Sequence, residues 1–225
     1  MKKIISKIIG ICLICSMVLF TGCASESMEF TTAKTALRSE KDFARAETWF
    51  NKALITDSLN AMVPYIYATE ILRPQKRYQE MAEMFEEALK RNPDAKLDKP
   101  FISEENYISI ISQGIHIYRQ EAWGILFNDA INDYETQNLN NCIEKLNIAK
   151  LVYPDEINTY ILICKIFISE LQKNRLANDD NEKETEYLDI INQNLNSGNK
   201  LENENIDLLT VSVDIAILSK DEQKI

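Results

Sequence analysis

DFARAETWFNKALITDS, residues 42–58, is the segment whose pattern decides the fold, because it recurs twice in looser form. The copies are RYQEMAEMFEEALKRNP (77–93) and NLNNCIEKLNIAKLVYP (138–154). In each, a small or slim residue is followed by a large apolar residue, then an alanine, then a helix-ending residue. The three sets are Ala46, Phe50, Ala53 and Ser58; Met81, Phe85, Ala88 and Pro93; and Cys142, Leu146, Ala149 and Pro154. Offsets of four and three residues place the first three side chains on one helical face. An alanine on that face lets another helix approach closely, so the sequence predicts a repeated helical scaffold.

Composition favours a helical globular protein. The chain has 225 residues, of which 45% are apolar, and it contains only five glycines and five prolines. Few turn-forming residues suit long helices better than a turn-rich β fold. The formal charge is −10, and no cluster of lysine and arginine matches the phosphates of a nucleic acid. We therefore expect no nucleic-acid partner, although a basic protein partner would be tolerated.

The N-terminus has the pattern of a secretion signal. Three lysines precede an apolar run over residues 8–20, which is too short to span a membrane permanently. The run ends in LFTGC (19–23). This ending resembles the lipobox of bacterial lipoproteins, with Phe20 where leucine is usual. An ordinary signal peptide or a single anchor helix is the alternative.

The lipobox resemblance implies a lipid anchor at Cys23. Diacylglycerol would be attached to the Cys23 thiol, residues 1–22 would be removed, and residues 23–27 would tether the body to a membrane of the bacterial envelope. Loss of the three lysines would leave a charge of −13. Ala24, rather than aspartate, follows the cysteine and favours the periplasmic side of the outer membrane.

The repeat spacing resembles that of the tetratricopeptide-repeat family. Phe50 and Phe85 are 35 residues apart, close to the family period of about 34 residues. Units at 27–60, 62–95 and about 123–156 match the family pattern, and a fourth begins at Ile157. The resemblance implies an all-α fold over residues 28–175, a right-handed α-α superhelix of helical hairpins. A polar loop and capping helices are expected over residues 176–225.

The third copy stands 61 residues after the second, which predicts an irregular element between them. Ser103, followed by two glutamates, resembles a helix start. An apolar stripe then continues without a break to about Gln137. We predict one long helix from Ser103 to Glu135, or two helices with a kink near Gly114 or Gly124.

The C-terminal part is expected to close the open end of the stack. A polar loop over 172–185, a helix over about 184–195 and an Asn-rich turn over 196–205 are predicted. A final helix over about 206–219 would then cover the stack through a row of apolar residues. This row consists of Ile206, Leu209, Val213, Ile217 and Leu218.

No recognisable catalytic or metal-binding motif is present. His116 is the only histidine, and with Cys142 and Cys164 it does not make a zinc site of the usual kind. Both cysteines fall where small buried residues are wanted, so we expect buried thiols, with a disulfide between them left open. The sequence therefore predicts no enzyme, no cofactor and no metal.

The tetratricopeptide resemblance also implies a groove lined by the first helix of each hairpin. Its positions map onto Thr31, Thr35 and Arg38; Ile66, Glu70 and Arg73; Phe127, Ile131 and Tyr134; and Ile161, Lys165 and Ile168. Such a groove would hold an amphipathic helix or an extended peptide. Alternatively, the later apolar positions simply pack against neighbouring helices.

The function expected from these features is that of a lipid-anchored adaptor, which binds a protein or peptide partner through helical repeats. Two alternatives remain open. One is an accessory lipoprotein of the outer-membrane β-barrel assembly machine, whose layout the chain resembles. The other is an enzyme or small-molecule-binding lipoprotein.

Overall fold

The computed structural model describes residues 26–104, 106–177 and 181–221. The predicted signal peptide and the lipid attachment at Cys23 lie outside the described residues. Within those ranges the chain is 77% helical, with one small two-stranded sheet, and this confirms the all-α class.

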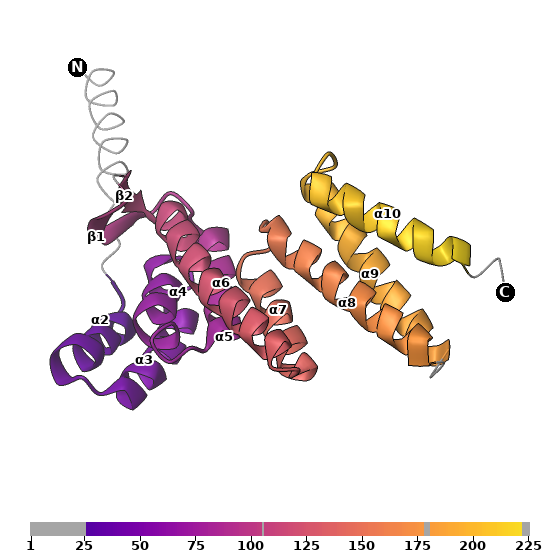
Figure 1. The fold of residues 1–225 in the computed structure, drawn as a ribbon. Helices are drawn as coiled ribbons and strands as arrows, with labels where there is room; N and C mark the ends of the chain where they lie inside the picture. Colours follow the sequence, from indigo (N-terminus) through magenta and orange to yellow (C-terminus); the bar gives the residue numbers. More distant parts are fainter. Residues whose placement is uncertain (1–25, 105, 178–180, 222–225) are drawn as a thin grey trace, which may run out of the picture.

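The helices follow one another as neighbouring pairs. In the first pair, α2 (Met28–Thr35) continues into the π-helix η1 (Ala36–Glu40) and packs against α3 (Phe43–Thr56). In the second, α4 (Met62–Ile66) continues into the π-helix η2 (Tyr67–Leu72) and packs against α5 (Tyr78–Arg91). Two further pairs are α6 (Ile111–Glu135) with α7 (Leu139–Val152), and α8 (Ile157–Ala177) with α9 (Asn181–Leu201). The last helix, α10 (Ile206–Asp221), packs against α8 and α9, and the pairs form an elongated body (Figure 1).

The backbone repeats at the same spacing as the sequence. A left-handed residue joins the two helices of each of the first three pairs, five positions before the slim residue of the motif; these residues are Lys41, Lys76 and Gln137. At the far end of the motif, the alanine carbonyl accepts a hydrogen bond from the amide four residues later, at Ala53, Ala88 and Ala149. The slim, large apolar and alanine positions of all three copies are fully buried. The predicted register of the three helices is therefore confirmed.

The prediction of a helix beginning at Ser103 is wrong. Strands β1 (Lys96–Ser103) and β2 (Asn106–Ile110) form an antiparallel hairpin there, and α6 begins only at Ile111. Over residues 106–110 the apolar residues alternate with period two, since Ile108 is buried and Tyr107 is exposed. Alternating β-branched and aromatic residues favour a strand over a helix. From Ile111 to Glu135 the helix is continuous through both glycines.

The predicted loop and turn of the C-terminal part are also largely wrong. Helix α8 runs on to Ala177, and α9 extends from Asn181 to Leu201 through the predicted Asn-rich turn. Packing outweighs the poor helix propensity of this segment, because Gly198 is buried against Leu208 of α10. One turn earlier, the side-chain amide of buried Asn194 donates to the Ile190 carbonyl.

The final helix occurs where it was predicted, but most of its predicted packing row faces solvent. Leu208 and Val211 are buried, whereas the exposed row consists of Ile206, Leu209, Val213 and Ile217. Only Leu218 of the predicted row packs against the core. Because α10 is apolar on both sides, periodicity alone did not identify the buried side.

Candidate functional site

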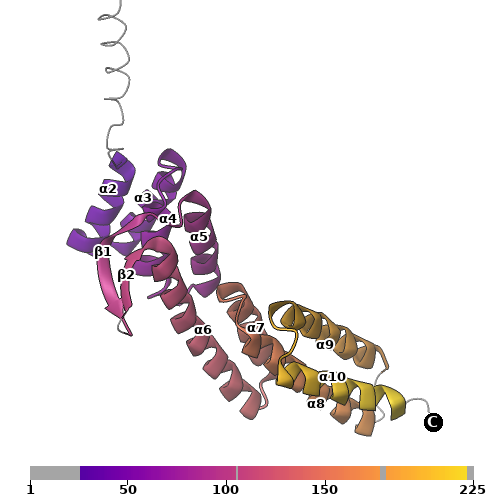
Figure 2. The ribbon, with the colours of Figure 1, turned by 90° about the horizontal axis from the view of Figure 1, so that it is seen from above.

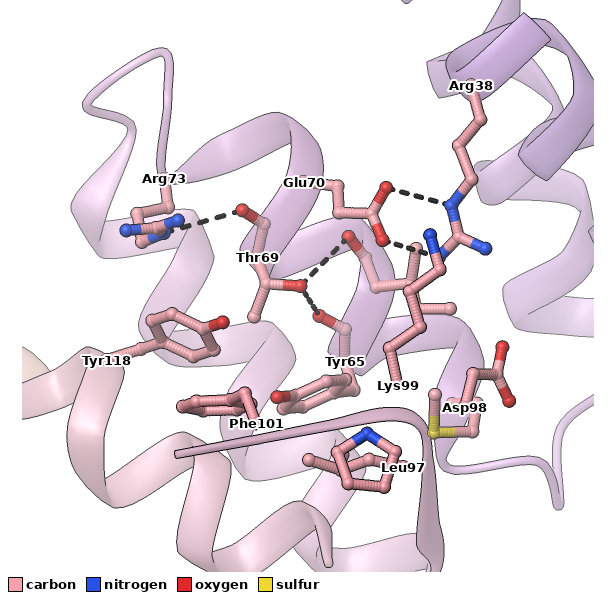
Figure 3. Close-up of a pocket in the computed structure, with 13 residues that line it drawn as sticks. Arg38, Tyr65, Thr69, Glu70, Arg73, Leu97, Asp98, Lys99, Phe101 and Tyr118 are labelled. Atoms are coloured by element: carbon pink, nitrogen blue, oxygen red, sulfur yellow. Dashed lines mark hydrogen bonds and ion pairs between the residues drawn. The ribbon is translucent and has the colours of Figure 1, made fainter. Parts of the chain in front are cut away.

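Four of the predicted groove residues meet at one cavity, which has a volume of about 280 Å³ (Figure 3). Arg38 comes from η1, Ile66 from α4, Glu70 from η2, and Arg73 from the end of η2. Further residues of α4 and η2, together with residues of β1 and α6, complete the lining. The additional lining residues are Met62, Tyr65, Thr69, Leu97, Asp98, Lys99, Pro100, Phe101 and Tyr118.

Two π-helical turns position the polar pair that lines one side of this cavity. Arg38 lies in η1 and Glu70 in η2. The Arg38 Nε atom donates to Glu70 Oε2 at 3.0 Å, and Nη2 donates to Oε1 at 2.5 Å. This two-point contact joins the first helical pair to the second and raises the pKa of Arg38. Short π-helical segments are rare and occur frequently at functional sites.

An aromatic cluster forms another side of the cavity. The guanidinium of Arg73 lies 4.6 Å from the centroid of the Tyr118 ring, and its Nη1 atom donates to Glu121 Oε2 at 3.1 Å. Phe101 from β1 lies 5.8 Å from Tyr118, measured between ring centroids, and Tyr65 lies 6.4 Å from it. Burial raises the pKa of both Tyr65 and Tyr118, so both hydroxyls stay neutral at physiological pH.

Strand β1 covers the cavity with a segment that is out of register with β2. Lys96 pairs with Ile110 and Phe101 with Ile108, so residues 97–100 have no register partner in β2. Lys99 extends from this segment toward the Arg38–Glu70 pair (Figure 3). Among the described residues, Lys99 has no ion-pair partner. It is therefore the cation of this cavity with the most freedom to meet an incoming anionic group.

The other predicted groove residues do not join the cavity. Ile161 is buried in α8, and the Lys165 ammonium pairs with Asp207 of α10 at 2.7 Å. The ring of Phe127 lies tilted against that of Trp123, with their ring centroids 4.9 Å apart. Phe127 and Tyr134 both pack against the second hydrophobic core, and Ile131 is half-buried. Contacts within the chain account for these positions.

Sequence reasoning missed the contributions of β1 and of Tyr118. The spacing of 61 residues between the second and third copies indicated an insertion. It did not indicate that Lys99 and Phe101 would fold back over the first two helical pairs, because that placement depends on the hairpin.

The remaining candidate groups have structural surroundings. Cys142 and Cys164 are buried free thiols, which excludes the disulfide between them. His116 is exposed, with its Nδ1 atom 3.4 Å from the Tyr153 hydroxyl oxygen. Across the described ranges, no three side chains gather that could hold a metal ion. None of the helices in that part of the chain is long and apolar enough to cross a membrane.

Comparison with known proteins leaves the site to be interpreted from its own chemistry. No protein-family model matches the chain, and no curated protein matches it significantly.

Proposed function

We propose that this chain is a lipid-anchored adaptor of the bacterial envelope. It binds an extended segment of a partner protein in the cavity at Arg38, Glu70 and Arg73. The observation that carries the proposal is the meeting of side chains from three successive helical pairs at one cavity, under a cover formed by β1. Anchoring is supported by the lipobox-like sequence ending at Cys23.

The recurring backbone features support a tetratricopeptide-like arrangement, for which we propose a right-handed superhelix. Left-handed connecting residues and alanine carbonyl contacts recur at the sequence period of the repeats. Repeats of this kind bury a continuous core only by stacking, and they present the first helices of the hairpins on one side. The cavity lies on that side in this proposal.

We propose an extended peptide rather than a helix as the occupant of the cavity. Strand β1 covers the cavity, whose volume is about 280 Å³. A few side chains of an extended segment fit into this volume beside the strand.

The lining also determines the chemistry of the segment. Tyr65, Phe101 and Tyr118 offer aromatic surface to an apolar side chain. Lys99 offers an ammonium group without a partner among the described residues, next to the Arg38–Glu70 pair. We therefore propose a segment with an apolar residue close to an acidic one.

Site-specific photo-crosslinking in the native envelope tests this proposal. A benzophenone amino acid at Pro100, an exposed lining residue beside Lys99, should give one specific crosslinked product, and the same amino acid at the exposed residue Glu83 of α5 should not. Tyr118→Ala should reduce the Pro100 product by removing aromatic surface. The bound region, mapped by mass spectrometry, should be an extended apolar–acidic segment. Equal products at both positions, or a product insensitive to Tyr118→Ala, would contradict peptide binding here.

The cavity itself also favours one alternative, a small-molecule receptor, because its volume lies near the lower end for ligand pockets, about 300 Å³. Thermal-shift measurements with sugars, nucleotides and short acidic peptides separate the two functions. Stabilisation by a small molecule and not by peptides would favour the receptor. A role in β-barrel assembly would require that depletion of the protein lowers the level of outer-membrane barrel proteins.

A further inference from the structure

Three large apolar side chains face solvent near the point where the described chain begins. Met28 is 69% exposed, Ile55 is 80% exposed and Leu59 is 89% exposed. They belong to the first turn of α2, the last turn of α3 and the loop that follows α3. Isolated exposed apolar residues are common, but an exposed group at one location is typical of an interaction surface.

These three residues lie at the same end of the molecule. The Ser27 amide, next to Met28, donates to Asp57 Oδ2 at 3.2 Å, between Ile55 and Leu59 in the sequence. Figure 2 shows α2 and α3 side by side at this end of the body. The start of α2 and the end of α3 therefore form one surface.

Hydrogen bonds hold the loop that carries Leu59. The Arg91 guanidinium of α5 donates to the carbonyl oxygens of Leu54, Asp57 and Asn60 at 3.0–3.1 Å. The Asn60 side-chain amide donates to Asp57 Oδ2 at 3.1 Å. Leu59 is thus exposed to solvent on a loop whose backbone is held by hydrogen bonds.

The proposed lipid anchor lies within a short reach of this surface. Cys23 is three residues before Glu26, the first described residue. Three extended residues span at most about 10–11 Å. With its lipid in a bilayer, Cys23 would hold this end of the molecule within the thickness of the headgroup region.

We infer that Met28, Ile55 and Leu59 form a second membrane contact, which inserts into the lipid interface beside the lipid on Cys23. The inference rests on the proposed lipidation. Stable membrane attachment generally needs two signals, and buried apolar side chains add to the acyl chains. Trp49 and Lys52 lie one to two turns before Ile55 in α3. The Lys52 ammonium lies 4.1 Å from the centroid of the Trp49 ring. Tryptophan and lysine are typical interfacial residues.

Fluorescent labelling of the full lipidated chain on liposomes tests the contact. Leu59→Cys and, as a control at the far end of α8, Leu176→Cys are labelled with nitrobenzoxadiazole. Leu176 is 87% exposed, and the native body thiols are buried and should not react. The liposomes contain phosphatidylethanolamine, phosphatidylglycerol and a nitroxide-labelled lipid as quencher. We expect blue-shifted, strongly quenched emission from the label at position 59, and unquenched emission from the label at position 176.

Mass spectrometry of the same samples separates this inference from the anchoring proposal. If Cys23 carries lipid and the label at position 59 remains unquenched, the membrane contact is refuted while anchoring stands. Equal quenching at both positions would also refute it, because it would mean that the whole body lies on the bilayer. A mature chain without lipid on Cys23 would overturn both.

Discussion

Arg91 joins the first two helical pairs, and its replacement should destabilise the protein strongly. Its side chain is only 6% exposed and donates to three carbonyl oxygens at the end of α3 and in the following loop. Its Nε atom also donates to Glu87 at 2.8 Å. A cation at this place satisfies carbonyl groups that a helix C-terminus leaves unpaired.

The magnitude follows from these bonds. Hydrogen bonds to charged groups contribute about 1.5–3 kcal/mol each. Their simple sum is an upper limit, because water can reach carbonyl groups at a helix end once the side chain is gone. We expect Arg91→Ala to lower the free energy of unfolding by about 2–4 kcal/mol. For a chain of this size that corresponds to a decrease in Tm of about 4–16 °C.

Urea denaturation of the mature chain, followed by circular dichroism at 222 nm, measures this effect. Lys90→Ala is the matched control, because Lys90 is exposed on the same helix and should change stability by less than about 0.5 kcal/mol. Arg91→Lys keeps the charge but loses the planar guanidinium, whose separate N–H groups reach several carbonyl oxygens. Its loss of unfolding free energy should therefore lie between those of Lys90→Ala and Arg91→Ala. A free energy of unfolding for Arg91→Ala equal to that of Lys90→Ala would refute this account of the junction.

Five further effects concern packing, protonation and thiol burial. Gly114→Ala should cost about 1–3 kcal/mol, because the new Cβ meets the ring and hydroxyl of buried Tyr65. Gly124→Ala, with nothing within 4 Å, should stabilise α6 by up to about 1 kcal/mol in the same denaturation assay. Ala88→Leu should cost about 1–3 kcal/mol, whereas the same change at exposed Lys52 should cost little; equal costs would mean that the helical register is wrong. Burial raises the pKa of Tyr65, so its contribution to stability is complete below about pH 10 and is lost as the pH rises further. Tyr65→Phe should therefore lose less stability than the wild type between about pH 9 and about pH 11 in urea titrations. Both body cysteines should resist a thiol-specific dye until the protein unfolds, and rapid labelling of the native protein would contradict their burial.

The repeated helices were predictable because their signal is local. An alanine and a large apolar residue three positions apart on one helical face require only helical geometry to be interpreted. Ala53, Phe85 and Ala88 are accordingly buried as predicted. Arg38, Glu70 and Arg73 were identified in another way, since they are groove positions implied by the tetratricopeptide resemblance, and the structure brings them to one cavity.

The β-hairpin was not predicted because two periods fit the same residues. Tyr107, Ile110 and Ile111 fit a helical stripe, whereas Ile108 and Ile110, separated by Ser109, also fit an alternating strand. Serine and glutamate at 103 and 104 resemble a helix start in sequence, yet Glu104 adopts a left-handed conformation in the hairpin turn. The choice depends on what the segment packs against, and Ile108 packs against the first core.

The candidate site arises from the combination of repeat and insertion. The repeat alone would leave Arg38, Glu70 and Arg73 on an open surface, where an arginine–glutamate pair contributes little. The hairpin brings Leu97, Lys99 and Phe101 over them and converts the surface into a partly covered cavity. At the other end, α10 packs against α8 and engages Lys165, so the chain itself occupies the corresponding positions there. The spacing of 61 residues between the second and third copies of the motif therefore makes room for the hairpin that covers this part of the cavity.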